Sequence, residues 1–246
     1  MPGTLYVVAT PLGNLEDITL RALRVLKEAD LIAAEDTRRT RILLARYGIA
    51  TPTTSYFEHN RARKGPYLLR LLREGKAVAL VTDAGTPGIS DPGAHLVAGA
   101  REAGIPVTPI PGPSAVTAAL SVAGLPADRF VFEGFLPVKA GRRFARLREL
   151  RALGRTVVIY EGPHRVAETL EAIGAVFGPV EVVLARELTK QFEEVRRGSP
   201  EALLAALGER RVKGEVTLII PPVLPRRGAD APQPSTPPGP RPGGDP

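Results

Sequence analysis

Short apolar strands alternate with helical segments along most of the chain, and few architectures are compatible with that order. Five strand-like runs occupy the first half, at 5–9, 31–35, 53–57, 78–82 and 107–110. Five more follow in the second half, at 130–134, 156–161, 181–187, 192–197 and 215–220. Because regular strand–helix alternation is typical of layered α/β structures, we expect two α/β domains with a mostly parallel core.

A Pro/Gly-rich segment separates the two sets of strands. We therefore predict an N-terminal α/β domain over 1–112 and a C-terminal α/β domain over 113–224. The first helix of the second domain is expected to have Pro113 in its first turn and to end at Gly124. Residues 225–246 are more than half Pro and Gly, which predicts a disordered tail.

Composition narrows the function classes. The chain has no cysteine and only three separated histidines, so disulfides and thiolate ligands are excluded and no metal site is expected. No apolar run approaches the roughly 18 residues that cross a bilayer, and no secretory signal precedes the first strand. We therefore expect a cytoplasmic protein. The formal net charge of +7 favours a polyanionic partner, although an Arg-rich composition also accompanies GC-rich or heat-adapted genomes.

Two loops rich in Gly, Pro and small hydroxyl residues follow predicted strands. Residues 83–93 follow one strand, and residues 10–14 follow the first strand. Small residues let the backbone approach a ligand closely, and open α/β sheets bind ligands at the carboxyl ends of their strands. An ordinary strand-to-helix connection has a similar composition, so the pattern alone leaves both interpretations open. Neither a P-loop nor a dinucleotide-binding glycine motif is present.

These loops occur together with four further motifs in an order that resembles the tetrapyrrole methylase superfamily. The further motifs are Glu35-Asp36-Thr37-Arg38, 109–115, Tyr160-Glu161-Gly162-Pro163-His164-Arg165 and Lys213-Gly214-Glu215. The resemblance extends from Thr4 to about residue 222. It implies two α/β domains of tetrapyrrole-methylase type with a cleft between them for S-adenosylmethionine, and it implies a homodimer.

The same resemblance, carried over position by position, implies cofactor contacts from both domains. In the first domain the implied residues are Pro11, Asp83, Gly85, Thr86, Pro87, Ile89 and Ser90. In the second domain they are Val116, Thr117, Ala118, Tyr160, Leu184, Ala185, Gly214, Glu215 and Val216. For Leu184 and Val216, packing in the core is the alternative interpretation.

The form of the second loop indicates the substrate. The chain reads Asp-Ala-Gly-Thr-Pro-Gly-Ile-Ser-Asp-Pro-Gly, which resembles RNA-modifying members, whereas members that methylate tetrapyrrole carbons tend to carry Gly-Asp-Pro. The resemblance thus implies methyl transfer to the ribose 2′-hydroxyl of a cytidine in small-subunit rRNA, within an assembled small ribosomal subunit. Clusters of basic residues fit phosphate contacts, with a solvated surface as the alternative. The candidates are Arg38, Arg39, Arg41, Arg61, Arg63, Lys64, Arg142, Arg143 and Arg146.

A hydroxyl nucleophile needs a group that removes its proton. Glu35 and Asp36, at the end of a predicted strand, are the preferred candidates, and capping of the following helix is the alternative.

Two other functions stay open. One is methylation of a tetrapyrrole carbon in a similar cofactor pocket, and the other is a non-catalytic role in RNA binding or ribosome assembly.

Overall fold

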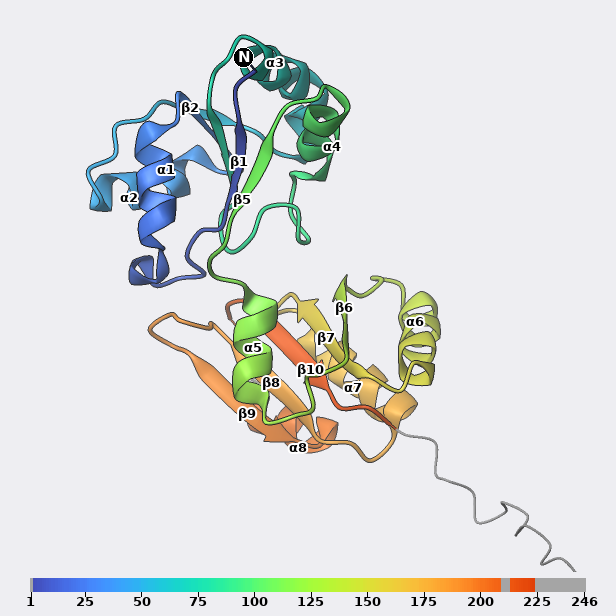
Figure 1. Ribbon diagram of the computed structural model, residues 1–246. Helices are drawn as coiled ribbons and strands as arrows, with labels where there is room; N and C mark the ends of the chain where they lie inside the picture. Colours follow the sequence, from blue (N-terminus) through green and yellow to red (C-terminus); the bar gives the residue numbers. More distant parts are fainter. Residues whose placement is uncertain (1, 209–212, 224–246) are drawn as a thin grey trace, which may run out of the picture.

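The computed structural model describes residues 2–208 and 213–223, and these form two five-stranded sheets, each covered by helices on both faces (Figure 1). The α/β class predicted from the sequence is confirmed. All ten predicted strands are present, with bounds within two residues of those expected. The predicted boundary at residue 112 stays a prediction, and the predicted tail over 225–246 lies outside the described residues.

The first sheet is entirely parallel, in the order β3-β2-β4-β1-β5. Its strands are β1 (Leu5–Val8), β2 (Leu31–Ala34), β3 (Thr53–Ser55), β4 (Val78–Val81) and β5 (Val107–Ile110). The helices are α1 (Leu20–Glu28) and α2 (Thr37–Arg46) on one face, and α3 (Arg61–Arg73) and α4 (Ala94–Glu102) on the other. Short 3-10 turns are η1 (Leu15–Asp17) and η2 (Glu58–Asn60). Because helices cover both faces, β4 is an uninterrupted buried apolar run.

The second sheet has the order β6-β7-β10-β8-β9. Its strands are β6 (Phe130–Phe135), β7 (Thr156–Glu161), β8 (Val182–Arg186), β9 (Glu194–Gly198) and β10 (Val216–Ile220). The expectation of a mostly parallel core is wrong here, because β6 and β7 run parallel while β10 runs antiparallel to β7 and β8, and β9 antiparallel to β8. The segment that joins β8 to β9 returns directly along the neighbouring strand, so no crossover helix separates them.

Helix α5 (Ala115–Ala123) covers one face of the second sheet, and α6 (Ala140–Ala152), α7 (Val166–Phe177) and α8 (Pro200–Leu207) cover the other. The expected start of α5 at Pro113 is wrong, because Ser114 in an extended conformation occupies the N-cap position. Gly124 ends the helix as expected, with a φ of 61°. In the described part of the chain, no helix is long and apolar enough to cross a membrane.

Candidate functional site

The loops that follow β1, β2, β4 and β5 meet at the carboxyl edge of the first sheet. The chain leaves the adjacent strands β1 and β4 toward helices on opposite faces, α1 and α4, and open α/β sheets bind ligands at such a crevice. A cavity of about 320 Å³ lies here, between this edge and the second sheet. Its walls are Leu12, Glu35, Arg39, Asp83, Ala84, Gly85, Thr86, Ile89, Ser90, Asp91, Ser114, Ala115, Phe135, Tyr160, Glu161, Gly162, Pro163, Glu215, Val216 and Thr217.

Backbone hydrogen bonds fix the loop after β4 against the loop after β1. The Thr10 N–H donates to the Gly85 carbonyl at 2.9 Å, and the Gly85 N–H donates to the Thr10 carbonyl at 3.0 Å. The buried Thr10 hydroxyl also donates to the Thr82 carbonyl at 2.9 Å. Gly85 has a φ of 80°, a conformation that favours glycine. These contacts hold the backbone of the cavity wall in one geometry.

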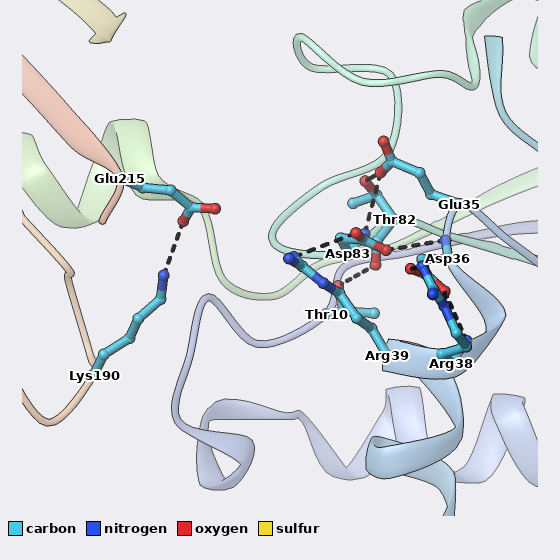
Figure 2. Close-up of polar contacts among 9 residues, drawn as sticks. All are labelled: Thr10, Glu35, Asp36, Arg38, Arg39, Thr82, Asp83, Lys190 and Glu215. Carbon is cyan, nitrogen blue, oxygen red and sulfur yellow. Dashed lines mark hydrogen bonds and ion pairs between the residues drawn. The ribbon is translucent and has the colours of Figure 1, made fainter. Parts of the chain in front are cut away.

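The ends of β2 and β4 are joined by side chains (Figure 2). Glu35 Oε2 accepts hydrogen bonds from the Thr82 hydroxyl at 2.6 Å and the Asp83 N–H at 3.3 Å. In return, Asp83 Oδ1 accepts from the Asp36 N–H at 3.0 Å, and Arg39 Nη1 lies 3.3 Å from Asp83 Oδ2. Burial and the nearby Glu35 carboxylate raise the pKa of Asp83. Glu35 and Asp83 therefore bind the two strand ends together while lining the cavity.

Asp36 occupies the N-cap of α2 and does not line the cavity. Its carboxylate accepts from the Arg38 N–H at 2.8 Å and from the Arg38 guanidinium at 2.7 and 3.1 Å. The Arg38 hydrogen bonds lower the pKa of Asp36 to about 2. Its position therefore fits the alternative interpretation, a helix cap, better than that of a base.

Asp91 lies farther along the loop after β4 and also lines the cavity. Burial raises its pKa to about 6, and the negative charges of Glu35, Asp83 and Glu215 act in the same direction. The neighbouring Ser90 side chain lies near Gly134 in β6, where a Cβ would come within 3.0 Å of Ser90 Oγ. This loop therefore spans from the first sheet to the second.

The second sheet contributes an aromatic wall and a buried acid. The Tyr160 ring packs edge-on against Phe132 and Phe135, with centroids 4.8 and 5.9 Å away. Burial, with a contribution from Asp91, raises the pKa of Tyr160 to about 12.

Glu161, at the end of β7, has a completely buried side chain. It accepts hydrogen bonds from the Thr169 hydroxyl at 2.7 Å and the Gly162 N–H at 2.8 Å, and it lies 3.4 Å from Arg165 Nε. Arg165 donates in turn to the Leu136 carbonyl at 2.8 Å. The floor of the cavity is therefore fixed by a buried ion pair.

The loop between β8 and β9 contacts the first half beside the cavity. Lys190 Nζ lies 3.1 Å from Glu215 Oε2 (Figure 2). It also lies 2.9 Å from Glu187 Oε1. The Lys190 side chain lies over Gly13, where a Cβ would overlap it, and the Asn14 N–H donates to Thr189 Oγ1 at 3.2 Å. Contacts outside the covalent connection thus also hold the two halves together.

The structure brings together about half of the residues that the sequence assigned to the cofactor. Those on the cavity wall are Asp83, Gly85, Thr86, Ile89, Ser90, Tyr160, Glu215 and Val216. Those off the wall are Pro11, Pro87, Val116, Thr117, Ala118, Leu184, Ala185 and Gly214. Leu184 packs in the core on the face opposite α5, which is the alternative that its pattern left open. Four further wall residues were not predicted from the sequence, namely Asp91, Ser114, Phe135 and Thr217, although Asp91 lies in the loop over 83–93 and Ser114 in the motif over 109–115.

The predicted basic residues have different environments. Arg143 is only 5% exposed and pairs with Glu168 at 3.0 Å, so its interpretation as a surface phosphate contact is corrected. Arg146 forms a bidentate pair with Glu133 and a further pair with Glu149. Ion pairs or hydrogen bonds with neighbours also hold Arg38, Arg39, Arg61 and Lys64. Three of the predicted residues are exposed and form no ion pair with any described residue, namely Arg41, Arg63 and Arg142.

Sequence comparison gives a family match and close relatives. The family model described as Tetrapyrrole (Corrin/Porphyrin) Methylases matches residues 4–204. The chain is 52% identical over 220 residues to the ribosomal RNA small subunit methyltransferase I of Mesorhizobium japonicum, covering 89% of this chain and 75% of that one. It is also 52% identical over 221 residues to the protein of the same name from Escherichia coli O157:H7, covering 89% and 77%.

Among solved structures, the chain is similar to uroporphyrin-III-C-methyltransferase from Thermus thermophilus. The TM-score is 0.65 and the identity is 26%, over 89% of this chain and 94% of the other.

Proposed function

The chain belongs to the tetrapyrrole methylase family, and from this premise we propose that it transfers the methyl group of S-adenosylmethionine to a ribose 2′-hydroxyl of a cytidine in small-subunit rRNA. The family resemblance predicted from the sequence is confirmed. One observation carries the choice of substrate. Relatives named for small-subunit rRNA are 52% identical over 89% of the chain, whereas the uroporphyrin methyltransferase is 26% identical over the same share.

The cavity suits this cofactor in size and charge. Its volume of about 320 Å³ lies within the usual range for small-molecule sites. S-adenosylmethionine carries a positive sulfonium and an ammonium group, and carboxylates from both halves line the cavity, Asp83 and Asp91 from the first and Glu215 from the second. Tyr160 and Phe135 offer an apolar surface for the purine. When bound, the sulfonium supplies a methyl group that a nucleophile can attack in line with the departing sulfur.

The residues of the chain hold this cavity ready before the substrate arrives. The paired hydrogen bonds between Thr10 and Gly85 fix the loop backbone, and the Glu161–Arg165 pair fixes the floor. A wall that is already ordered loses little conformational entropy when a ligand binds. Binding energy is then available for orienting the methyl donor and the ribose.

Exposed cations supply the surface for RNA. Arg41, Arg63 and Arg142 carry no ion pair with any described residue and are free to contact phosphates. Arg39 lies at the cavity itself, where it pairs with the partly exposed Asp83. Phosphate contacts of this kind orient a nucleic acid, and the cavity would then select the ribose. Arg38 lies in the first turn of α2, the helix that carries Arg41. Arg61 and Lys64 lie in the first turn of α3, the helix that carries Arg63, so all three add positive charge near these arginines.

We further propose that the substrate is the assembled small ribosomal subunit, that the protein acts in the cytoplasm where such subunits are, and that it forms a homodimer. Some large apolar side chains of the second half are exposed, and contact with a second copy of the chain would remove them from water. Val138 is 74% exposed, Phe192 68% and Phe135 56%. Light scattering coupled to size exclusion tests this, since a monomer at micromolar concentration would contradict it.

The experiment that tests the proposed function follows tritiated methyl from S-adenosylmethionine into three substrates side by side. These are unmodified small ribosomal subunits, free small-subunit rRNA and a mixture of tetrapyrroles. Label in rRNA, and more in subunits than in free rRNA, is expected. Label in a tetrapyrrole would contradict the proposed substrate, and the similarity to the uroporphyrin methyltransferase makes that the second candidate. A protein that binds no S-adenosylmethionine would favour a non-catalytic role.

A further inference from the structure

Five carboxylates line the cavity, and four of them are held in place by hydrogen bonds or ion pairs with neighbouring residues. They are Glu35, Asp83, Asp91, Glu161 and Glu215. Glu35 accepts two hydrogen bonds, Asp83 pairs with Arg39, and Glu215 pairs with Lys190. Glu161 is buried against Thr169 and Arg165.

Asp91 differs from the other four. No ion pair joins it to any residue in 2–208 or 213–223, and the nearby Thr82 hydroxyl donates its hydrogen bond to Glu35 at 2.6 Å. The loop that carries it lies against the second half, because a Cβ on Gly134 would come within 3.0 Å of Ser90 Oγ. Among the described residues, Asp91 is thus the cavity carboxylate that neither an ion pair nor a backbone N–H holds in place.

The charged and titratable groups that face Asp91 come from both halves. Glu35 and Asp83 face it from the first sheet, and Tyr160 and Glu215 from the second. Arg39 on the wall pairs with Asp83, and Lys190, which lies beside the cavity, pairs with Glu215. Within 2–208 and 213–223, no cation pairs with the Asp91 carboxylate.

We propose that Asp91 is the catalytic residue that accepts the proton of the ribose hydroxyl during methyl transfer. This inference rests on the proposed function, because a tetrapyrrole carbon would present no such hydroxyl. In the step, the bond between the ribose O2′ and the methyl carbon forms while the bond between that carbon and sulfur breaks. The hydroxyl proton passes to Asp91, so that the carboxylate and the sulfonium both become neutral and charge is conserved.

The protonation behaviour of the acids agrees with this assignment. Burial and three nearby acids raise the pKa of Asp91 to about 6, so at neutral pH it is mostly ionised yet more basic than an ordinary carboxylate. General bases work best when their pKa lies near the working pH. Asp36, in contrast, has its pKa lowered to about 2 by Arg38 and lies off the cavity wall.

The test compares Asp91→Asn with Asp128→Asn, an exposed aspartate outside the cavity. Calorimetric titration of each purified variant with S-adenosylmethionine is the first readout, and we expect the affinity of Asp91→Asn to fall by no more than about tenfold, because one of several carboxylates that face the cationic cofactor loses its charge. Turnover on small subunits should fall by about 100-fold or more, the usual contribution of a general base. Asp128→Asn should match wild type in both. Loss of cofactor binding in Asp91→Asn, or turnover within about threefold of wild type, would overturn the inference.

The pH dependence separates proton transfer from a structural role. For wild type, kcat/KM should rise with pH through about 6 and then level, since this parameter reports the free enzyme. The rise of kcat, which is the acidic limb of its pH profile, should occur at a lower pH, because the bound cationic cofactor favours the ionised form of Asp91. Asp91→Asn should lack this limb, whereas Asp91→Glu should retain it with reduced turnover. An unchanged limb in Asp91→Asn would exclude Asp91 as the acceptor.

A second readout needs no turnover. Carbon-13 NMR of the aspartate carboxyls in the cofactor-free protein should show one group titrating near 6 that disappears in Asp91→Asn. Titration of that group near 4 would contradict the inference. The outcomes also distinguish the two proposals, because wild-type protein that labels no ribose refutes the function itself, while an active Asp91→Asn refutes only the role of Asp91.

Discussion

Replacement of Gly85 by alanine tests whether the loop after β4 must keep its observed backbone. Gly85 has a φ of 80° and exchanges two hydrogen bonds with Thr10. A Cβ at this position would lie 3.5 Å from Leu12 Cδ2, an ordinary contact, so no clash contributes to the effect. The perturbation is therefore conformational and confined to the cavity wall.

The expected magnitude follows from that geometry. A non-glycine residue in this region costs roughly 1–2 kcal/mol, and relaxation out of it sacrifices two hydrogen bonds worth about 1 kcal/mol each. Either way the free energy of unfolding should fall by about 1–2 kcal/mol, or about 2–8 °C in Tm for a protein of this size. If the bound cofactor requires the native loop, a cost of up to about 2 kcal/mol should raise its Kd by up to about 30-fold.

Gly48→Ala is the matched control, because Gly48 has a φ of 61°, has nothing within 4 Å of its Cβ position and lies off the cavity wall. Thermal unfolding and calorimetric titration with S-adenosylmethionine are measured for both variants. Both should lose similar stability, and Gly85→Ala alone should lose affinity. Equal affinities in the two variants would refute the assignment of this loop to the cofactor.

Three further predictions concern single side chains. Glu161→Gln leaves the largely buried Arg165 without its partner and should lower stability by roughly 3 kcal/mol in urea unfolding, so an unchanged midpoint would contradict the buried pair. Asp36→Asn should remove a part of the stability that depends on pH. Because the pKa of Asp36 is lowered in the folded state, its contribution to the free energy of unfolding is complete above about pH 4 and lost by about pH 2. Acid unfolding should therefore show that wild type loses more stability than the variant over that range. Arg142→Ala should weaken RNA binding and reduce the salt dependence by about one charge, whereas Arg143→Met should reduce stability with no change in that slope, and the reverse pattern would refute the surface assignment.

Strand positions were predictable because most of the strands are short apolar runs bounded by turn residues, although β3 and β9 are mainly polar. The first sheet is buried on both faces, so β1 and β4 have apolar signals that do not depend on their neighbours. The pairing directions in the second sheet were not predictable in the same way. An apolar run such as β10 reads the same whether its neighbour is parallel or antiparallel, and β10 lies between β7 and β8, its neighbours in space but not in sequence.

The candidate site was predictable to the extent that it lies in one continuous loop. Asp83, Gly85, Thr86, Ile89 and Ser90 follow one strand and all line the cavity. The predicted cofactor contacts from α5, which are Val116, Thr117 and Ala118, do not line the cavity. They were not predictable because successive residues of a helix point to different sides.

Helix α5 and Arg143 illustrate this limit. Val116 faces the sheet, while the hydroxyl of the exposed Thr117 bonds back to the Ser114 carbonyl. Arg143 depends on Glu168 of the neighbouring helix, a tertiary partner that no spacing within α6 reveals.

The account depends on methyl transfer from a donor held in this cavity to a ribose oxygen of rRNA. The most direct measurement uses S-adenosylmethionine with a trideuterated methyl group, unmodified small subunits, and either wild-type protein or Thr86→Arg, which places a long cation on the cavity wall. Mass spectrometry of the digested rRNA should detect trideuterated 2′-O-methylcytidine with wild type and none with the variant, whose folding is checked by circular dichroism. Deuterated methyl on a base, or undiminished transfer by a folded Thr86→Arg protein, would contradict the account.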